Sequence, residues 1–159
     1  MSEPATTALP AIAERLRAWD ASAVHEVIDF RGEVTLVVPR EQLRRVCSYL
    51  RSEPGLEFNF LSDVSAMDRF PLEPRFDVNY HLLSITTRQV VRVRVRLEGS
   101  DPQVESVTAI WPTAEWHERE VFDLFGVRFA GHPDLRRILM PENWEGHPLR
   151  KDYPVEGFR

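Results

Sequence analysis

The chain has 159 residues, of which 43% are hydrophobic and 28% charged, and its formal net charge is −5. This length supports one domain with its own core, and the composition is ordinary for a soluble globular protein. The negative charge argues against a nucleic-acid partner. No apolar run approaches the roughly 20 residues that cross a bilayer, and the N-terminus does not read as a secretory signal. The default expectation is a cytoplasmic bacterial protein without direct membrane insertion.

The N-terminal part of the chain predicts a helix followed by a hairpin. Residues 1–8 are expected to be disordered. Over residues 9–19 the apolar side chains recur at helical spacing, which predicts the first helix. Two short β-type runs follow, at 24–30 and 33–38. Arg31-Gly32 between them predicts a tight turn, so the two runs are expected to pair as a hairpin.

A second amphipathic helix is predicted for residues 40–52, and Pro54-Gly55 closes it. Its apolar face carries Cys47, the only cysteine, which excludes a disulfide within the chain. One thiolate does not normally hold an iron–sulfur cluster or a thiolate-type zinc site. We interpret Cys47 as a small buried hydrophobe rather than a reactive thiol.

Three further strands are predicted, over residues 56–67, 76–86 and 89–97. The last is the clearest, because apolar residues alternate with Arg92, Arg94 and Arg96. That period is typical of a half-exposed antiparallel strand. A surface for single-stranded nucleic acid would add exposed aromatic side chains on the basic face. We therefore interpret the arginines as a solvated face or as an ion-paired subunit contact.

Residues 107–111 lead into a last helix over residues 112–125, and Gly126 suits a left-handed helix end. The predicted order is α-β-β-α-β-β-β-α. It indicates a two-layer α+β domain over residues 9–130, with a mixed or antiparallel sheet of about five strands and helices packed on it.

The last helix is rich in charged side chains. Glu115, Arg119 and Asp123 have the i, i+4 and i+8 spacing of an ion-paired ladder on one helix face. Such a stripe between apolar faces indicates an interface. Glu118 and Glu120 extend the carboxylates toward a proton-transfer cluster, but the sequence shows no burial that would shift their pKa values. Charge pairing through Arg119 is the preferred interpretation.

The histidines give no convincing metal site. His117 and Glu120 have a spacing used by helical metal ligands, but no third ligand is evident. A helix with ordinary charge pairs is favoured by about four to one. His132 and His147 each precede a proline, where an imidazole bonded to the backbone is favoured over a metal ligand. No nucleotide-binding motif or nucleophile elbow is present either.

From residue 131 onward the pattern changes. The segment 131–159 holds four of the twelve prolines and three of the seven glycines, yet large anchors such as Trp144, Leu149 and Tyr153 recur. This composition predicts an extended C-terminal interaction arm that lies along another protein. Ordering so many residues without a partner costs backbone entropy, so we expect the arm to gain little by folding back on its own domain.

The motifs between residues 111 and 154 resemble a known family, the C subunit of the proton-pumping NADH:quinone oxidoreductase, respiratory complex I. The resemblance covers roughly a third of the chain, and an ordered series of motifs is more specific than any single one. The motifs are Glu118-Arg119-Glu120, Asp123-Leu124-Phe125-Gly126, Gly131-His132-Pro133, Arg136-Arg137-Ile138-Leu139 and the run from Gly146 to Pro154.

This resemblance implies an accessory subunit of the hydrophilic arm that braces the quinone-reducing connecting module and packs chiefly against the D subunit. It implies a hetero-oligomer, peripheral on the cytoplasmic side of the bacterial inner membrane. The complete enzyme passes electrons from NADH through FMN and iron–sulfur clusters to quinone, coupled to ion translocation. Those cofactors are expected in partner subunits, with none in this chain and no catalytic activity in the isolated chain.

The residues expected at the subunit interface come from the last helix and the arm. They are Glu115, Trp116, Glu118, Arg119, Glu120, Asp123, His132, Arg136, Arg137, Trp144, His147, Leu149, Arg150, Lys151, Asp152 and Tyr153.

Two other functions stay open. One is a homologous subunit of a membrane-bound hydrogenase or a ferredoxin-dependent dehydrogenase, which neighbouring genes would distinguish. The other is a freestanding protein-binding domain, which a monomeric chain absent from membranes would support. An independent small enzyme has the least support.

Overall fold

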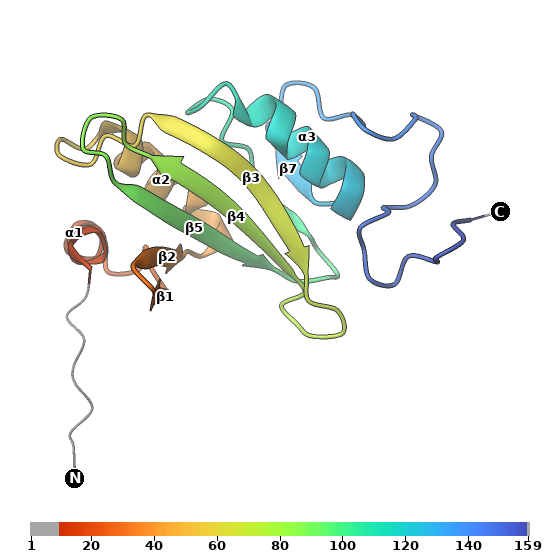
Figure 1. The fold of residues 1–159 in the computed structure, drawn as a ribbon, viewed down its shortest axis with the longest axis horizontal. Helices are drawn as coiled ribbons and strands as arrows, with labels where there is room; N and C mark the ends of the chain where they lie inside the picture. Colours follow the sequence, from red (N-terminus) through yellow and green to blue (C-terminus); the bar gives the residue numbers. More distant parts are fainter. Residues whose placement is uncertain (1–9, 159) are drawn as a thin grey trace, which may run out of the picture.

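The computed structural model describes residues 10–158, and the expected disorder of residues 1–8 lies outside them (Figure 1). The helices are α1 (Ala11–Trp19), the short 3-10 helix η1 (Arg40–Gln42), α2 (Leu43–Ser52) and α3 (Ala114–Phe125). The strands are β1 (Glu26–Phe30), β2 (Glu33–Val37), β3 (Phe60–Asp68), β4 (Phe76–Leu83), β5 (Val90–Leu97), β6 (Gln103–Glu105) and β7 (Arg128–Ala130). The predicted α+β class is confirmed.

The main sheet has five strands in the order β1-β2-β5-β4-β3. All neighbours are antiparallel except β2 and β5, which are parallel, so the sheet is mixed. Arg31 and Gly32 form the turn of the β1–β2 hairpin with positive φ angles of 53° and 83°, as the sequence predicts. β3 is an edge strand, and α3 runs alongside it (Figure 1).

The core lies between one face of this sheet and the helices. Val93 and Val95 of β5 belong to one buried cluster with Leu16 of α1, Leu50 of α2 and Val121 of α3. Each helix presents an apolar face to the sheet because its apolar residues recur every three or four positions. The predicted burial of the cysteine in α2 is confirmed.

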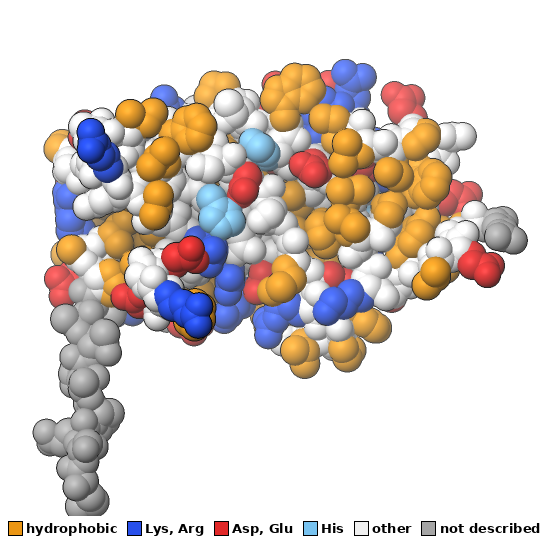
Figure 2. Space-filling model, in the orientation of Figure 1, with side chains coloured by type: hydrophobic (Ala, Val, Ile, Leu, Met, Phe, Trp, Pro, Cys, Tyr) orange, Lys and Arg blue, Asp and Glu red, His pale blue; other side chains and the backbone are white. Residues whose placement is uncertain are grey.

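The opposite face of the sheet is polar. Arg92 pairs with Glu33 at 3.3 Å and Arg96 with Glu26 at 3.0 Å. Figure 2 shows basic and acidic side chains mixed over this face. The arginine stripe of β5 is therefore balanced by carboxylates of the same chain rather than left as a free basic surface.

Parts of the fold differ from the sequence prediction. The strands β6 and β7 pair in parallel as a separate two-stranded sheet, which was not predicted. Each has three residues, too few to show a period of two. The second predicted helix begins as η1 and continues as α2, and β3 begins at Phe60 rather than at residue 56. Within residues 10–158, the length and hydrophobicity needed to span a membrane are reached by no helix.

Candidate functional site

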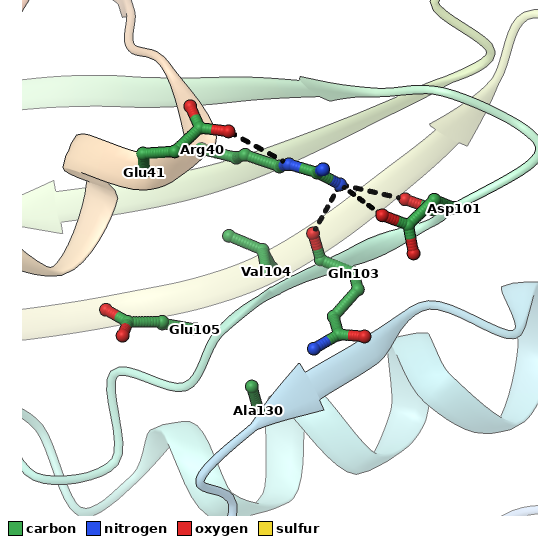
Figure 3. Close-up of a pocket in the computed structure, with 7 residues that line it drawn as sticks. All are labelled: Arg40, Glu41, Asp101, Gln103, Val104, Glu105 and Ala130. Atoms are coloured by element: carbon green, nitrogen blue, oxygen red, sulfur yellow. Dashed lines mark hydrogen bonds and ion pairs between the residues drawn. The ribbon is translucent and has the colours of Figure 1, made fainter.

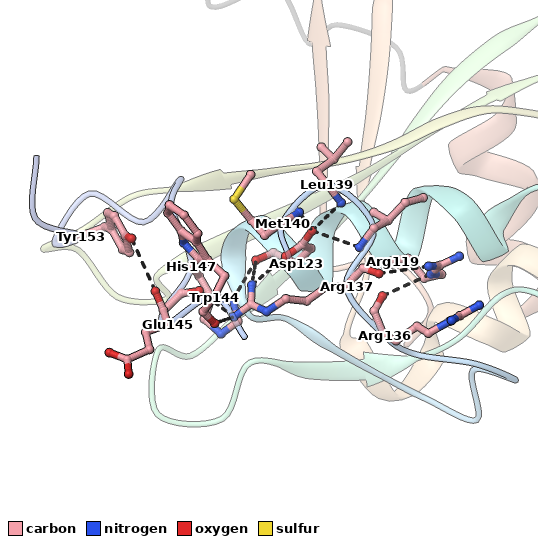
Figure 4. Close-up of polar contacts among 12 residues, drawn as sticks. Arg119, Asp123, Arg136, Arg137, Leu139, Met140, Trp144, Glu145, His147 and Tyr153 are labelled. Atoms are coloured by element: carbon pink, nitrogen blue, oxygen red, sulfur yellow. Dashed lines mark hydrogen bonds and ion pairs between the residues drawn. The ribbon is translucent and has the colours of Figure 1, made fainter. Parts of the chain in front are cut away.

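The carboxylate of Asp123 organises the junction between α3 and the C-terminal segment (Figure 4). It has no exposed surface. One oxygen accepts the backbone N–H groups of Ile138, Leu139 and Met140 at 3.1, 2.7 and 2.8 Å. The other accepts a hydrogen bond from Arg137 at 2.7 Å. Burial alone would raise the pKa of Asp123, but these hydrogen bonds outweigh it and hold the pKa below its ordinary value.

Arg137 ties three points of the chain together. Its guanidinium donates to the main-chain oxygen of Asp123 at 3.1 Å as well as to the carboxylate. It also donates to the carbonyls of Trp144 and Gly146 at 3.0 and 2.8 Å. A planar guanidinium has five donors in a fixed geometry, so one arginine can hold several acceptors at once. Polar contacts therefore fasten the segment to α3.

The end of α3 is capped by the same segment. Gly126 ends the helix in the left-handed conformation, with φ of 75°, as predicted. The last carbonyls of a helix lack partners within it. Here the carbonyls of residues 123–125 accept hydrogen bonds from His147 Nδ1, the Leu149 amide and Arg150 Nε at 2.9, 3.0 and 2.6 Å. The backbone role predicted for His147 is confirmed.

His132 also bonds to the backbone. Its Nε2 lies 3.0 Å from the main-chain oxygen of Glu115, and its Nδ1 accepts the amide of Asp134 at 3.0 Å. The backbone contact predicted for a histidine before proline is thus confirmed. The contact joins the start of α3 to the start of the C-terminal segment.

The ion-paired ladder predicted for α3 is wrong. Within residues 10–158, Arg119 forms no ion pair with Glu115 or Asp123. It is buried and donates instead to the carbonyls of Arg136 and Arg137 at 3.2 and 3.1 Å. The physical reason is that these carbonyls lie in irregular backbone and need donors that no helix or strand supplies.

A second set of polar contacts holds the segment to the sheet. Arg75 donates to both oxygens of the buried Asp68, at 2.9 and 2.8 Å, and to Asp152 at 2.8 Å. The amide of Lys151 donates to Asp68 at 2.8 Å. Burial would raise the pKa of Asp68, but the hydrogen bonds from Arg75, Lys151 and Phe70 lower it to about 2. The carboxylate therefore stays charged at neutral pH.

These contacts correct one expectation for residues 131–159, that they gain little from their own domain. The described part, up to residue 158, has no helix or strand, but it is bonded to α3 and to β3. That it lies along another protein stays a prediction.

Large hydrophobic side chains of this segment nevertheless stay exposed. Leu139 is 56% exposed, Trp144 41%, Leu149 51% and Phe158 58%. We call these four residues the tail anchors. Figure 2 shows hydrophobic side chains gathered over this part of the molecule. The segment therefore combines a fixed backbone with uncovered apolar surface.

Glu118 has a role that was not predicted. It is fully buried and accepts hydrogen bonds from Ser106 Oγ at 2.7 Å and the Val107 amide at 2.8 Å. Burial raises its pKa to about 7, against the lowering effect of the two hydrogen bonds. The predicted pairing with Arg119 is wrong. The available signal was helical spacing, which puts Glu118 near the face that also carries the buried Val121.

The predicted interface residues divide into two groups. Glu118, Arg119 and Asp123 are buried, so they support the surface from inside rather than offering a direct contact. The remaining residues are partly or fully exposed, and their contact with a partner stays a prediction.

No metal site is found among the described residues, since no three His, Cys, Asp or Glu side chains form a group that could hold an ion. Figure 3 shows a polar hollow of about 410 Å³ beside β6 and β7. The cation in its lining, Arg40, is already paired with Glu41 and with Asp101, at 3.1 and 3.0 Å. That hollow therefore offers no free cation to a ligand.

Known proteins share both the sequence and the fold. Residues 36–159 match the family described as respiratory-chain NADH dehydrogenase, 30 Kd subunit. The C subunit of NADH-quinone oxidoreductase from Roseiflexus sp. (strain RS-1) is 48% identical over 144 residues, which are 91% of this chain and 83% of that protein. The C 2 subunit from Rhizobium etli (strain CIAT 652) is 50% identical over 128 residues, which are 80% and 68%.

Two solved structures are similar as well. The trypsin-resistant fragment (1-134) of Nqo5 aligns with a TM-score of 0.68 at 34% identity, over 78% of this chain and 99% of the fragment. A chain of the archaeal membrane-bound sulfane sulfur reductase aligns with a TM-score of 0.73 over 91% and 84%, but at 24% identity it shows the fold alone. The chain therefore belongs to the family of the 30 Kd subunit of the respiratory-chain NADH dehydrogenase, a multi-subunit oxidoreductase.

Proposed function

We propose that the chain is a cofactor-free accessory subunit in the peripheral arm of a bacterial NADH:quinone oxidoreductase. It braces the quinone-reducing module on the cytoplasmic side of the membrane and packs chiefly against the D subunit. FMN and the iron–sulfur clusters belong to partner subunits. The names of relatives at 48% and 50% identity support the choice of NADH:quinone oxidoreductase over a related membrane-bound machine.

One observation carries the bracing role: the tail anchors are exposed while the backbone that bears them is held by buried charges. Leu139 is 56% exposed, yet its amide is bonded to Asp123 at 2.7 Å. Large apolar side chains on ordered backbone are typical of protein interfaces, and burying one contributes about 1.5–3 kcal/mol. Because the backbone is already ordered, binding costs less conformational entropy.

The buried cysteine supports a role without a resident cluster. Cys47 has no exposed surface, and burial, with Glu118 nearby, raises the pKa of its thiol. A cluster ligand is a thiolate at neutral pH. Cys47 is held in the opposite state, as a neutral core side chain.

The experiment compares two surface variants of the tagged full chain, purified from native membranes. Leu139→Ser/Trp144→Ser removes two tail anchors, and Phe30→Ser/Val90→Ser is the control. Phe30 and Val90 are 64% and 66% exposed and belong to strands of the main sheet. Mass spectrometry of co-purifying subunits should show about tenfold less of the D subunit with the first variant, as expected from about 1.4 kcal/mol of lost affinity. The control should be unchanged.

Both free variants should unfold at the temperature of the wild type, because the substituted side chains are exposed. Equal recovery of the D subunit with both variants would contradict the proposal. The same preparation also tests the alternative machine. Recovery of hydrogenase subunits in place of NADH- and flavin-binding subunits would assign the chain to the alternative complex.

A further inference from the structure

A groove of about 390 Å³ runs between the edge strand β3 and α3. Residues 63–66 of β3 form one wall, the face of α3 between His117 and Phe125 forms the other, and Leu149 lies at the groove as well. Figure 1 shows α3 running beside β3. We call this the β3 groove.

The strand in this groove is an unpaired edge. Within the described residues β3 pairs with β4 and has no strand on its other side. Edge strands are usually protected by lysine, proline or short length. β3 has nine residues, none of them proline, glycine, lysine or arginine, while the opposite edge strand β1 has five. One irregularity lies between Leu61 and Asp63, and the pairing is regular from Asp63 to Asp68.

The groove carries negative charge beside apolar walls. Its lining includes the carboxylates of Asp63 and Glu120 and the imidazole of His117, and no lysine or arginine. Asp63 contacts His81 at 2.6 Å, yet its side chain is still 50% exposed, and Glu120 is exposed. A ligand for this groove therefore combines apolar side chains with positive charge.

We propose that the β3 groove binds an extended, basic segment of a neighbouring subunit, which adds to β3 as a further strand. The proposal rests on the proposed function only in that the chain works inside a multisubunit complex. Strand addition supplies backbone hydrogen bonds, and pockets for alternate side chains supply specificity. The regular stretch from Asp63 to Asp68 accommodates a strand of about six residues, roughly 20 Å long.

A second copy of this chain does not fit the groove. Pairing of β3 with β3 would bring the acidic groove of one copy against that of the other, including Asp63 and Glu120 twice. Like charges facing each other across strands are destabilising. Lysine or arginine at alternate positions of a partner segment would instead meet these carboxylates.

The charge test uses Glu120→Lys in the tagged full chain, with Glu105→Lys as the matched control. Both glutamates are exposed, and Glu105 lies on β6, outside the groove. We expect Glu120→Lys to lower recovery of the chain in the membrane complex about tenfold. The control should assemble normally, and the thermal unfolding of both free variants should match the wild type.

The contact test places the photo-crosslinking residue p-benzoylphenylalanine at Ser65 in the assembled complex. Mass spectrometry should map the crosslink to a lysine- or arginine-bearing segment of one other subunit. A crosslink to a second copy, to this chain's own C-terminal residues, or to no protein would overturn the proposal. So would normal assembly of Glu120→Lys. If Leu139→Ser/Trp144→Ser still fails to assemble in that case, the proposed function stands and only the groove assignment falls.

Discussion

The guanidinium of Arg137 binds Asp123 twice, donating to its carboxylate at 2.7 Å and to its main-chain carbonyl at 3.1 Å. The carboxylate lies in the last turn of α3, where the helix dipole disfavours negative charge. Arg137 and three backbone N–H groups offset that cost. The pair therefore sets the position at which the C-terminal segment leaves the domain.

Asp123→Asn should loosen this segment without unfolding the sheet. The amide has one acceptor oxygen for four donors, and it leaves Arg137 without its counter-charge. Breaking a buried charge pair on one side costs about 3 kcal/mol or more. Hydrogen exchange of residues 138–151 should quicken, while β4 and β5 stay protected. Glu120→Gln, an exposed change on the same helix, is the control. Unchanged protection in Asp123→Asn would refute the central role of this carboxylate.

Gly126→Ala should displace the same segment by a steric route. A Cβ at Gly126 would lie 2.5 Å from a guanidinium nitrogen of Arg150 and 2.6 Å from the ring of His147. Gly131→Ala is a matched control, because its φ is also positive, at 82°, and no atom lies within 4 Å of the added Cβ. Both should lose about 1–2 kcal/mol from the left-handed conformation. Only Gly126→Ala should lose more in equilibrium unfolding, and equal losses would contradict the steric account.

The sheet is more readily predicted from the sequence than the polar junction is. Strand β5 is predicted correctly because Val91, Val93 and Val95 alternate with arginines, a signal that is local and needs no tertiary knowledge. Helix α3 and its end at Gly126 follow from local signals in the same way.

The junction depends instead on partners that are distant in the sequence. Asp68 binds the amide of Lys151 across 83 positions, and Arg119 binds carbonyls 17 and 18 positions away. Local spacing offered Arg119 two nearby carboxylates, and the i, i+4 rule favoured them. The tertiary demand of unpaired carbonyls in irregular backbone outweighs that small local preference.

Glu118 should make stability depend on pH near neutrality. Its pKa is about 7 in the folded chain against an ordinary value of 4.5, so the folded state holds the proton more tightly. The contribution of this group to stability therefore falls as pH rises from about 4.5 to 7, by about 3 kcal/mol. Tyr80 and Cys47 interact with Glu118, but burial raises both of their pKa values, so they stay neutral in this range.

The measurement is the free energy of unfolding of the wild type and of Glu118→Gln at several pH values. Subtracting the two curves removes the titration of the five histidines, which both proteins share. The difference should change by about 3 kcal/mol across the window and level off above it. A flat difference curve would show that Glu118 titrates at an ordinary pKa.

The purified chain should be colourless and free of iron and flavin. Its only cysteine is buried in the core, so it cannot supply thiolates to a cluster. Metal analysis and a visible absorption spectrum test this directly. Stoichiometric iron or flavin retained by the pure chain would contradict the cofactor-free assignment.

The central claim is that the tail anchors are a prepared binding surface for another subunit. Hydroxyl-radical footprinting measures it most directly, because it reports the solvent exposure of Leu139, Trp144 and Phe158 in the free chain and in the membrane complex. We expect all three to be oxidised readily in the free chain and protected at least several-fold in the complex, while Phe30 stays reactive in both. Equal oxidation of the tail anchors in the two states would contradict the claim.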